Sequence, residues 1–310
     1  MLAPNAAWKQ TARQIYEKLQ LNQISGLVGS AKRIVIVPHD RLWYLPFELL
    51  PLAGQPDDTW LASKSITYVP TLGAIDVAYG IPKVSRDTAG VIGKVFSNDS
   101  KKNKEVAKSV LDAVPNSSGI YLTEQVTVPN EKWLRLRSDQ LWIAAQPTKA
   151  PSVWDQSLIA FPKLKQSSLG NWLETPLASP TSVVAAGLTS SVKGPAIGNG
   201  NDLFLPACAM LMTGSRSVVL SRWPVGGRSA GILLRRYLEE RESSASSTAW
   251  RRATLALWPE DFLIADEPAL LPAGDASDAI VTGSHPVLWA SYMHLGDQLV
   301  PPAVQPAAQP

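Results

Sequence analysis

Short apolar runs recur along the chain and alternate with stretches in which apolar residues follow a helical period. The runs, each short enough for one strand, lie at 33–37, 65–69, 90–96, 119–123, 140–145, 157–161, 182–186 and 217–221. The helical stretches lie at 6–20, 101–114, 129–136, 167–174, 202–213 and 227–242. Strands that are buried on both faces read as continuous apolar runs, and their alternation with helices is typical of parallel sheets. The pattern therefore predicts an α/β fold with a mainly parallel central sheet covered by helices.

The segments between and after these elements set the domain boundaries. Ser and Ala dominate residues 243–248, and Pro, Gly, Asp and Ala dominate residues 259–284, so we expect both to be surface connections. Residues 298–310 are mostly Pro, Ala and Gln, a composition that neither fills a core nor pairs as a strand. We therefore predict a helical segment at 1–30 that packs on one domain at 31–297, followed by a disordered tail.

Composition and charge exclude several functions. Of the 310 residues, 45% are hydrophobic, and 29 basic against 26 acidic side chains leave a net charge of +3, too little for a dedicated nucleic-acid binder. The single cysteine, Cys208, can form no internal disulfide. No stretch approaches the roughly 20 apolar residues of a membrane span, and the first residues, MLAPN, show no basic region followed by an apolar run, so we expect no signal peptide here. We expect a soluble, cytoplasmic protein with no nucleic-acid or membrane partner.

A glycine-rich run precedes the predicted helix at 202–213. Gly194, Gly198 and Gly200 resemble a phosphate cradle only superficially, because their spacing fits neither a Walker A motif nor a dinucleotide fingerprint. Asp202 suits the N-cap of that helix, where its carboxylate would occupy the helix end. We therefore expect a flexible loop here, and we predict no cofactor and no bound metal.

Three separated segments carry a resemblance to one family. Residues 35–50 read VIVPHDRLWYLPFELL, residues 212–225 read MTGSRSVVLSRWPV, and residues 285–297 read HPVLWASYMHLGD. In this order they are similar to the patterns "LhyLPF", "aGarsVvaSLWpV" and "HPyyWAaFvliGd" of the CHAT domain family. The resemblance spans about residues 20–297 and implies a caspase-like, three-layer α/β sandwich with a mainly parallel central sheet.

The resemblance also implies where a catalytic dyad would stand. In that family a His in "HfATHG" ends one strand and a Cys in "VVLSACETG" ends its neighbour; the imidazole takes the thiol proton and the thiolate attacks a peptide carbonyl. Alignment on residues 142–147 places Gln146 at the histidine position, and alignment on residues 183–191 places Leu188 at the cysteine position. Neither side chain can perform this chemistry, so we infer that the dyad has been lost.

Other residues are weaker candidates for catalysis. Cys208 lies in an apolar helical stretch, where a lone cysteine is usually a small buried side chain, and we predict that it packs against the sheet. Ser190 and Ser191 would need a nearby base, and no histidine is placed to supply it. We expect structural roles for the three histidines, which are His39, His285 and His294.

The segment after the last predicted strand is the candidate peptide-docking site. In the caspase-like fold the corresponding segment lines the substrate cleft, so the resemblance places Ser221, Arg222 and Trp223 there. Arg and Trp are frequent interface anchors, and Arg222 together with Arg216 and Arg228 favours an acidic partner. The alternative is that Trp223 fills the core while the arginines pair with nearby carboxylates.

The leading hypothesis is a CHAT-like pseudopeptidase that binds a protein or peptide as a regulatory module. Family relatives commonly carry helical repeats upstream and act in bacterial regulatory or defence systems, so an upstream helical-repeat domain is a candidate partner. One alternative is an active cysteine endopeptidase of the CHAT or caspase type with a displaced site. Another is a purely structural domain, which would show no saturable binding of peptides.

Overall fold

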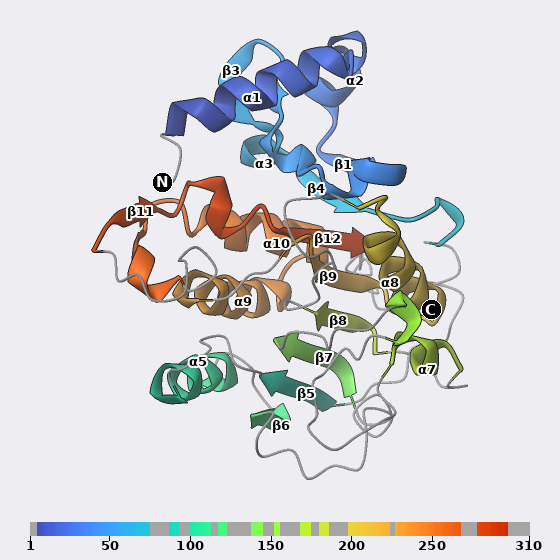
Figure 1. The fold of residues 1–310 in the computed structure, drawn as a ribbon, viewed down its shortest axis with the longest axis vertical. Helices are drawn as coiled ribbons and strands as arrows, with labels where there is room; N and C mark the ends of the chain where they lie inside the picture. Colours follow the sequence, from blue (N-terminus) through green and yellow to red (C-terminus); the bar gives the residue numbers. More distant parts are fainter. Residues whose placement is uncertain are drawn as a thin grey trace, which may run out of the picture.

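A computed structural model describes residues 5–74, 87–92, 100–112, 117–122, 138–144, 152–155, 168–174, 180–185, 198–223, 227–267 and 278–296. In this part of the chain, eight strands form one central sheet (Figure 1). In spatial order they are β1 (Arg33–Ile36), β4 (Ser65–Tyr68), β12 (Tyr292–Gly296), β9 (Ser217–Ser221), β8 (Ser182–Ala185), β7 (Ser138–Ala144), β5 (Asp87–Ile92) and β6 (Ser117–Leu122). The sheet is mostly parallel, as the sequence predicted.

Strand direction reverses once across the sheet. β9, β8, β7, β5 and β6 are parallel to one another, whereas β12 runs antiparallel to β9, with Tyr292 opposite Ser221 and Gly296 opposite Ser217. β4 is parallel to both β12 and β1. Five strands therefore end at one edge of the sheet, which we call the carboxyl edge, and β1, β4 and β12 end at the opposite edge.

Side chains of the central strands alternate between two cores, one on each face of the sheet. On β9, Val218 and Leu220 belong to the first core and Val219 to the second. The adjacent β8 repeats the pattern, with Val183 in the first core and Val184 in the second. Successive strand residues point to opposite faces, so a strand covered on both sides needs apolar residues at every position. This requirement explains the continuous apolar runs.

Helices cover both faces and complete the three layers. The first core includes residues of α7 (Leu169–Glu174) and α8 (Asn201–Met212), and partly buried residues of α1 (Asn5–Lys18) pack against it. The second core includes residues of α9 (Arg228–Arg241) and α10 (Ser246–Leu255), and α5 (Ser100–Asp112) packs on α9. None of the described helices is long and apolar enough to cross a membrane.

Short elements connect these layers. The further helices are η1 (Leu21–Ile24), α2 (Ser25–Ser30), η2 (Asp40–Tyr44), η3 (Phe47–Leu49), α3 (Trp60–Ser63), η4 (Val153–Asp155), η5 (Ile264–Asp266) and η6 (Pro286–Leu288). Two antiparallel pairs lie outside the central sheet, formed by β2 (Pro51–Leu52) with β3 (Gln55–Thr59) and by β10 (Asp261–Leu263) with β11 (Ile280–Thr282). Most elements of the sheet and its covering helices lie at or near their predicted ranges. The predicted helix at 129–136, strand at 157–161 and tail at 298–310 lie outside the described residues.

Two predicted surface connections were wrong in part. Residues 243–248 were expected to be a surface connection, but α10 begins at Ser246, and Ser246 and Ser247 are buried. The helix forms because Ala249, Trp250 and Ala253 give it an apolar side, which the second core covers. Within residues 259–284, β10 and β11 pair with each other, and Phe262 of β10 is fully buried.

Candidate functional site

The carboxyl edge is where the resemblance places the catalytic dyad. β7 and β8 are parallel neighbours, so both end at this edge, side by side. Groups that follow neighbouring parallel strands are the usual source of sites in α/β sheets. Gln146 and Leu188 follow β7 and β8 by two and three residues, and they lie outside the described residues, as do Ser190 and Ser191. Their assignment to the dyad positions therefore stays a prediction.

The only cysteine lies in a helix that is held at the opposite edge. At the start of α8, the two carboxylate oxygens of Asp202 accept hydrogen bonds from the Tyr44 hydroxyl at 2.5 and 2.6 Å. Tyr44 ends η2, which follows β1 at the opposite edge. After α8 ends, the backbone N–H of Arg216 donates to the carbonyl of Thr181, just before β8 begins. Both ends of α8 are thus tied away from the carboxyl edge, and Cys208 with them.

Cys208 is less buried than expected. It was predicted to pack against the sheet, but its side chain is partly exposed. The core side of α8 includes Leu203, Ala207 and Met210, and the next residue after Ala207 turns away by about 100° on an α-helix. Partial burial raises the pKa of the Cys208 thiol, which disfavours the reactive thiolate. Within the described residues, no hydrogen bond joins Cys208 to a histidine.

Asp202 is not the N-cap of α8, in contrast to the prediction. Gly200 takes that position with a φ of 81°, a left-handed conformation that glycine adopts readily. A Cβ atom at Gly200 would lie 2.2 Å from the carbonyl oxygen of Asp40, so the close approach of η2 also requires glycine. Asp202 lies in the first turn instead, where its carboxylate binds Tyr44.

The three histidines occupy three separate places. His39 is exposed and follows β1, at the edge opposite to the predicted dyad. The Nδ1 atom of His285 accepts the backbone N–H of the second residue after it and so caps η6. His294 is fully buried on β12, and its Nδ1 and Nε2 atoms lie 3.2 Å from the hydroxyls of Thr67 and Ser217. His285 and His294 thus hold positions that stabilise the fold.

Arg222 lies inside the protein, just beyond the end of β9. Its side chain is 0% exposed, and Nη1 donates to the carbonyls of Ala290 at 2.9 Å and Tyr292 at 2.5 Å. Nη2 lies 3.3 Å from both carboxylate oxygens of Glu48. The guanidinium carbon lies 4.8 Å from the centre of the Tyr68 ring. Arg222 therefore adopts the arrangement described above as the alternative to docking, in which it pairs with a carboxylate.

The burial of Ser221 and Arg222 reduces the candidate docking site to one residue. Ser221 and Arg222 are both fully buried, so neither can contact a partner directly. Trp223 is partly exposed and packs against the second core with the rest of its side chain. The sequence analysis missed Glu48, although an acidic residue inside the apolar stretch 42–50 signals a buried partner. Of the three docking candidates, only Trp223 presents surface.

A second buried carboxylate holds the start of α9. Glu267 is 2% exposed and accepts hydrogen bonds from the backbone N–H and the hydroxyl of Ser229, both at 2.7 Å. The first N–H groups of a helix have no partner within the helix, so Glu267 acts as a remote cap. Burial raises the pKa of Glu267 to about 7, although the Ser229 hydrogen bonds oppose this. No sequence signal pointed to Glu267, because its partner lies 38 residues away.

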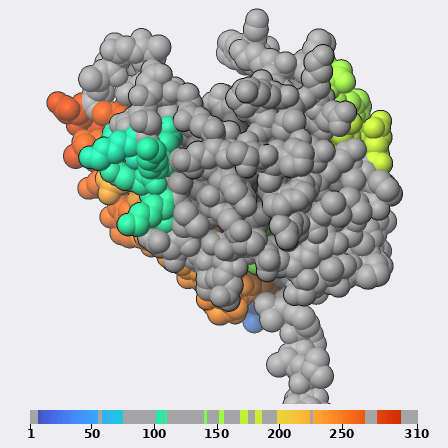
Figure 2. Space-filling view, turned by 90° about the horizontal axis from the view of Figure 1, so that it is seen from below, coloured from blue at the N-terminus to red at the C-terminus, as the bar shows by residue number. Residues whose placement is uncertain are grey.

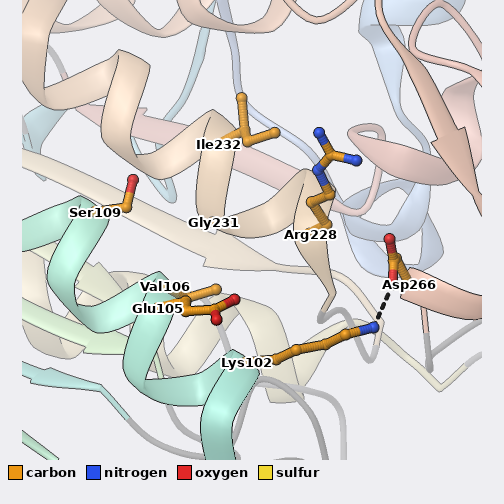
Figure 3. A pocket seen from close by; sticks show the side chains of 8 residues that line it. All are labelled: Lys102, Glu105, Val106, Ser109, Arg228, Gly231, Ile232 and Asp266. Carbon is orange, nitrogen blue, oxygen red and sulfur yellow. Dashed lines mark hydrogen bonds and ion pairs between the residues drawn. The ribbon is translucent and has the colours of Figure 1, made fainter.

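A cavity of about 350 Å³ lies between α5 and the start of α9 (Figure 3). We call it the α5–α9 groove. Its lining residues are Lys102, Glu105, Val106 and Ser109 from α5, Arg228, Gly231 and Ile232 from α9, and Asp266 from η5. Figure 2 shows α5 on the surface, next to segments from the C-terminal part of the chain. Within the described residues, no cluster of three or more His, Cys, Asp or Glu side chains could hold a metal ion.

The model of the CHAT domain matches residues 9–297. This chain belongs to the CHAT domain family. Two structures of the separase–securin complex of Saccharomyces cerevisiae are similar, with TM-scores of 0.47 and 0.46 and sequence identities of 12% and 15%. Each match covers 82% of this CHAT domain chain but only 15% or 14% of the matched chain. A comparison with curated proteins finds no significant match.

The three segments that resemble the CHAT patterns meet at Arg222. Glu48 comes from the first segment, Arg222 from the second, and the acceptor carbonyls of Ala290 and Tyr292 from the third. More than a hundred residues separate the first segment from the second, and several elements separate the second from the third. The guanidinium of Arg222 nevertheless joins all three. This CHAT domain therefore has a buried polar junction at the end of β9, next to the candidate docking surface.

Proposed function

We propose that this CHAT domain is a pseudopeptidase, a regulatory module that binds a protein or peptide at the carboxyl edge without cleaving it. The observation that carries the proposal is the place of Cys208. The only thiol of the chain lies on α8, which is tied to the edge opposite the ends of β7 and β8. The sequence offers Gln146 and Leu188 at the positions where the family has its histidine and cysteine.

The same observations argue against an active peptidase with a displaced site. A nucleophilic cysteine needs a lowered pKa or a neighbouring base, whereas burial raises the pKa of Cys208. His294 is fully buried between Thr67 and Ser217, and within the described residues no hydrogen bond joins Cys208 to a histidine. No contact among the described residues supports an active cysteine peptidase.

The docking surface in this proposal centres on Trp223. It follows a strand end at the carboxyl edge, and it is the one residue of the predicted docking set with exposed surface. Tryptophan contributes a large, rigid contact area and is over-represented among interface hot spots. Arg222 fixes the end of β9 beside this surface through its bonds to Glu48 and Tyr292. Because Arg222 is buried, it does not contact the partner directly.

The cellular setting belongs to the proposal as well. Relatives of CHAT domains commonly carry upstream helical repeats and act in bacterial regulatory or defence systems, so we keep a helical-repeat domain as a candidate partner. A single cysteine fits a reducing compartment such as the cytoplasm.

One experiment tests the loss of catalysis. The protein is incubated with mixed fluorogenic peptide libraries and with a thiol-reactive peptide electrophile, in parallel with Cys208→Ala. We expect no turnover above buffer, and labelling no faster than that of a small, non-peptidic thiol reagent. Peptide cleavage that disappears in Cys208→Ala would establish an active enzyme and end the proposal.

A second experiment tests the binding function. Immobilised peptide arrays are probed with the wild type and with Trp223→Ala, after melting curves have shown that both are folded. We expect saturable binding to a subset of peptides that the Trp223→Ala substitution weakens by roughly tenfold, the loss typical of an interface anchor. A purely structural domain would show no saturable binding with either protein.

A further inference from the structure

We propose that Asp266 and Glu267 form a clamp with one arm on α5 and one on α9, and that the α9 arm opens when the Glu267 carboxyl group loses its proton. The start of α9 is then a pH-sensitive conformational switch. Asp266 is the last residue of η5, and Glu267 follows it directly. Neither residue belongs to the predicted docking set, so this inference does not depend on the proposed function.

The two arms of the clamp differ in their exposure to water. Asp266 forms an ion pair with Lys102 of α5, and the two side chains are 18% and 41% exposed (Figure 3). Glu267 is 2% exposed and binds the backbone N–H and the hydroxyl of Ser229 on α9, both at 2.7 Å. Water and salt screen the first arm, whereas the second arm holds a carboxyl group away from water. The α9 arm therefore responds more strongly to a change of charge.

The start of α9 closes the site around Glu267. Gly227 lies immediately before α9 with a φ of 112°, which favours glycine. A Cβ atom at Gly227 would lie 2.7 Å from the carbonyl oxygen of Asp266 and would also collide with the Glu267 carboxyl group. A contact that has no room for a methyl group has none for water. On this side, the carboxyl group reaches water when residues 227–229 move away.

The opposite side of the site belongs to the central sheet. Tyr292 of β12 is fully buried, and within the described residues its hydroxyl has no hydrogen-bond partner. Burial, and then the charge of Glu267, raise the pKa of Tyr292, so the phenol stays neutral. β12 lies between β4 and β9, where it cannot move without breaking the sheet. The start of α9 is therefore the side that yields.

The contacts of Glu267 suit the protonated carboxyl group. One oxygen accepts the Ser229 N–H, and the protonated oxygen can donate to the Ser229 hydroxyl, so both bonds form without a charge. Burial raises the pKa of Glu267 to about 7, and the charge of Asp266 adds to this effect. The Ser229 bonds and the charge of Arg228 oppose it. Both protonation states are therefore populated near neutral pH.

Opening of the α9 arm changes the α5–α9 groove. Lys102 and Asp266 line this groove, and so does Arg228, which lies between the two α9 contacts of Glu267 at Gly227 and Ser229. A movement of residues 227–229 shifts Arg228 relative to Asp266, while the ion pair on α5 remains. The clamp thus converts a change of pH into a change in the shape of a surface cavity.

Hydrogen exchange of the full chain at about pH 6 and about pH 8 tests the switch. After correction for the intrinsic effect of pH on exchange, the protection of residues 228–232 should fall about tenfold, as linkage requires when a pKa of about 7 returns to 4.5 on opening. In Glu267→Gln the amide keeps both bonds to Ser229 but has no proton to lose, so protection should not change. Constant protection in the wild type, or an equal fall in the variant, would overturn the switch.

Two charge variants should alter this fall in opposite directions. Asp266→Asn removes a charge that raises the pKa of Glu267, so the fall between pH 6 and pH 8 should become smaller. Arg228→Gln removes a charge that lowers this pKa, so the fall should become larger. Because Asp266→Asn also breaks the ion pair with Lys102, the wild type at high salt is its control. Equal falls in both variants would show that Glu267 is not the titrating group.

Urea separates local opening from unfolding of the whole protein. Opening of one helical turn exposes little surface, so the protection of residues 228–232 should hardly respond to low urea concentrations. α10 lies in the second core and is the reference for global unfolding, whose protection falls steeply with urea. Equal protection and equal urea dependence of the α9 start and α10 would show that Glu267 is released only by global unfolding. The switch would then be wrong.

Discussion

Single residues decide how the docking surface is built, and Arg222 is the clearest case. The family pattern quoted for this segment, "aGarsVvaSLWpV", has leucine where this chain has Arg222. A fully buried guanidinium is tolerated because it donates to two carbonyls, faces the Glu48 carboxylate and stacks on Tyr68. The Tyr68 hydroxyl also donates to Glu48 at 2.7 Å. Arg222 and Glu48 therefore form one polar unit.

This unit predicts strong coupling between the two charges. Arg222→Leu leaves the Glu48 carboxylate buried without its cation, so the free energy of unfolding should fall by about 3–5 kcal/mol. Adding Glu48→Gln should recover most of this loss, because a neutral amide can still accept the Tyr68 hydrogen bond. Urea denaturation of the wild type, both single variants and the double variant gives the coupling energy. Simple additivity of the two losses would contradict the polar unit.

Glu267 predicts a pH dependence of stability. Its folded-state pKa of about 7 lies above the ordinary value of 4.5, so folding favours the protonated form. Its contribution to the free energy of unfolding is complete below about pH 4.5. At most about 3 kcal/mol of that free energy is lost as the pH rises through 7. Asp266 raises this pKa further, and Arg228 lowers it.

Glu267→Gln is the matched control for this titration. The amide keeps an acceptor for the Ser229 N–H but has no proton to lose. The stability of the wild type relative to the variant should therefore decrease between about pH 5 and pH 8 in urea denaturation. A difference that stays constant over this interval would show that Glu267 is ionised throughout.

At the scale of elements, the strands were the most predictable part. β8 and β9 bury both faces, so their apolar runs are continuous and stand out in the sequence. β12 was not predicted as a strand, because the buried His294 interrupts its apolar pattern. α10 was misread because its first turn is serine-rich, and those serines are buried by tertiary packing. The α5–α9 groove could not be predicted either, because it forms only where tertiary packing brings α5 and α9 together.

The contact of α5 with α9 gives a prediction at this scale. Gly231→Ala should gain helix propensity, but its new methyl group would lie 3.0 and 3.3 Å from the two methyl groups of Val106. Overpacking should dominate, and the free energy of unfolding should fall by about 1 kcal/mol. Val106→Ala in the same chain should relieve the clash, so the double variant is less destabilised than the sum of the two single variants.

Gly29→Ala is the control for helix propensity alone. Gly29 lies in α2, and a Cβ atom there would meet no atom within 4 Å. This substitution should therefore stabilise the protein by about 0.5 kcal/mol or somewhat more. A Gly231→Ala variant that is stabilised to the same extent as Gly29→Ala would show that the two helices are not closely packed.

At the scale of the whole molecule, the reversal of strand direction matters most. Sequence patterns predicted a mainly parallel sheet but not that β12 runs antiparallel to β9, because direction depends on pairing between distant segments. The reversal separates two edges: β7, β8 and β9 end at one, while β1 and β4 end at the other together with the anchors of α8. His39 therefore lies at the edge opposite to the predicted dyad, and Cys208 lies in a helix that is held at that same edge.

The two edges predict where a bound peptide can deliver a reactive group. In a Cys208→Ala background, Leu188→Cys should place a thiol at the carboxyl edge if the family alignment is right. A peptide chloroacetamide that binds at this edge raises the local concentration of electrophile there, so it should label this variant roughly tenfold faster than the wild type, relative to iodoacetamide. Intact-protein mass spectrometry gives both rates.

Adding Trp223→Ala should abolish the advantage of the peptide reagent while leaving the iodoacetamide rate unchanged. Preferential labelling of Cys208 in the wild type would instead put the peptide site at the opposite edge, against both the alignment and the proposed docking surface.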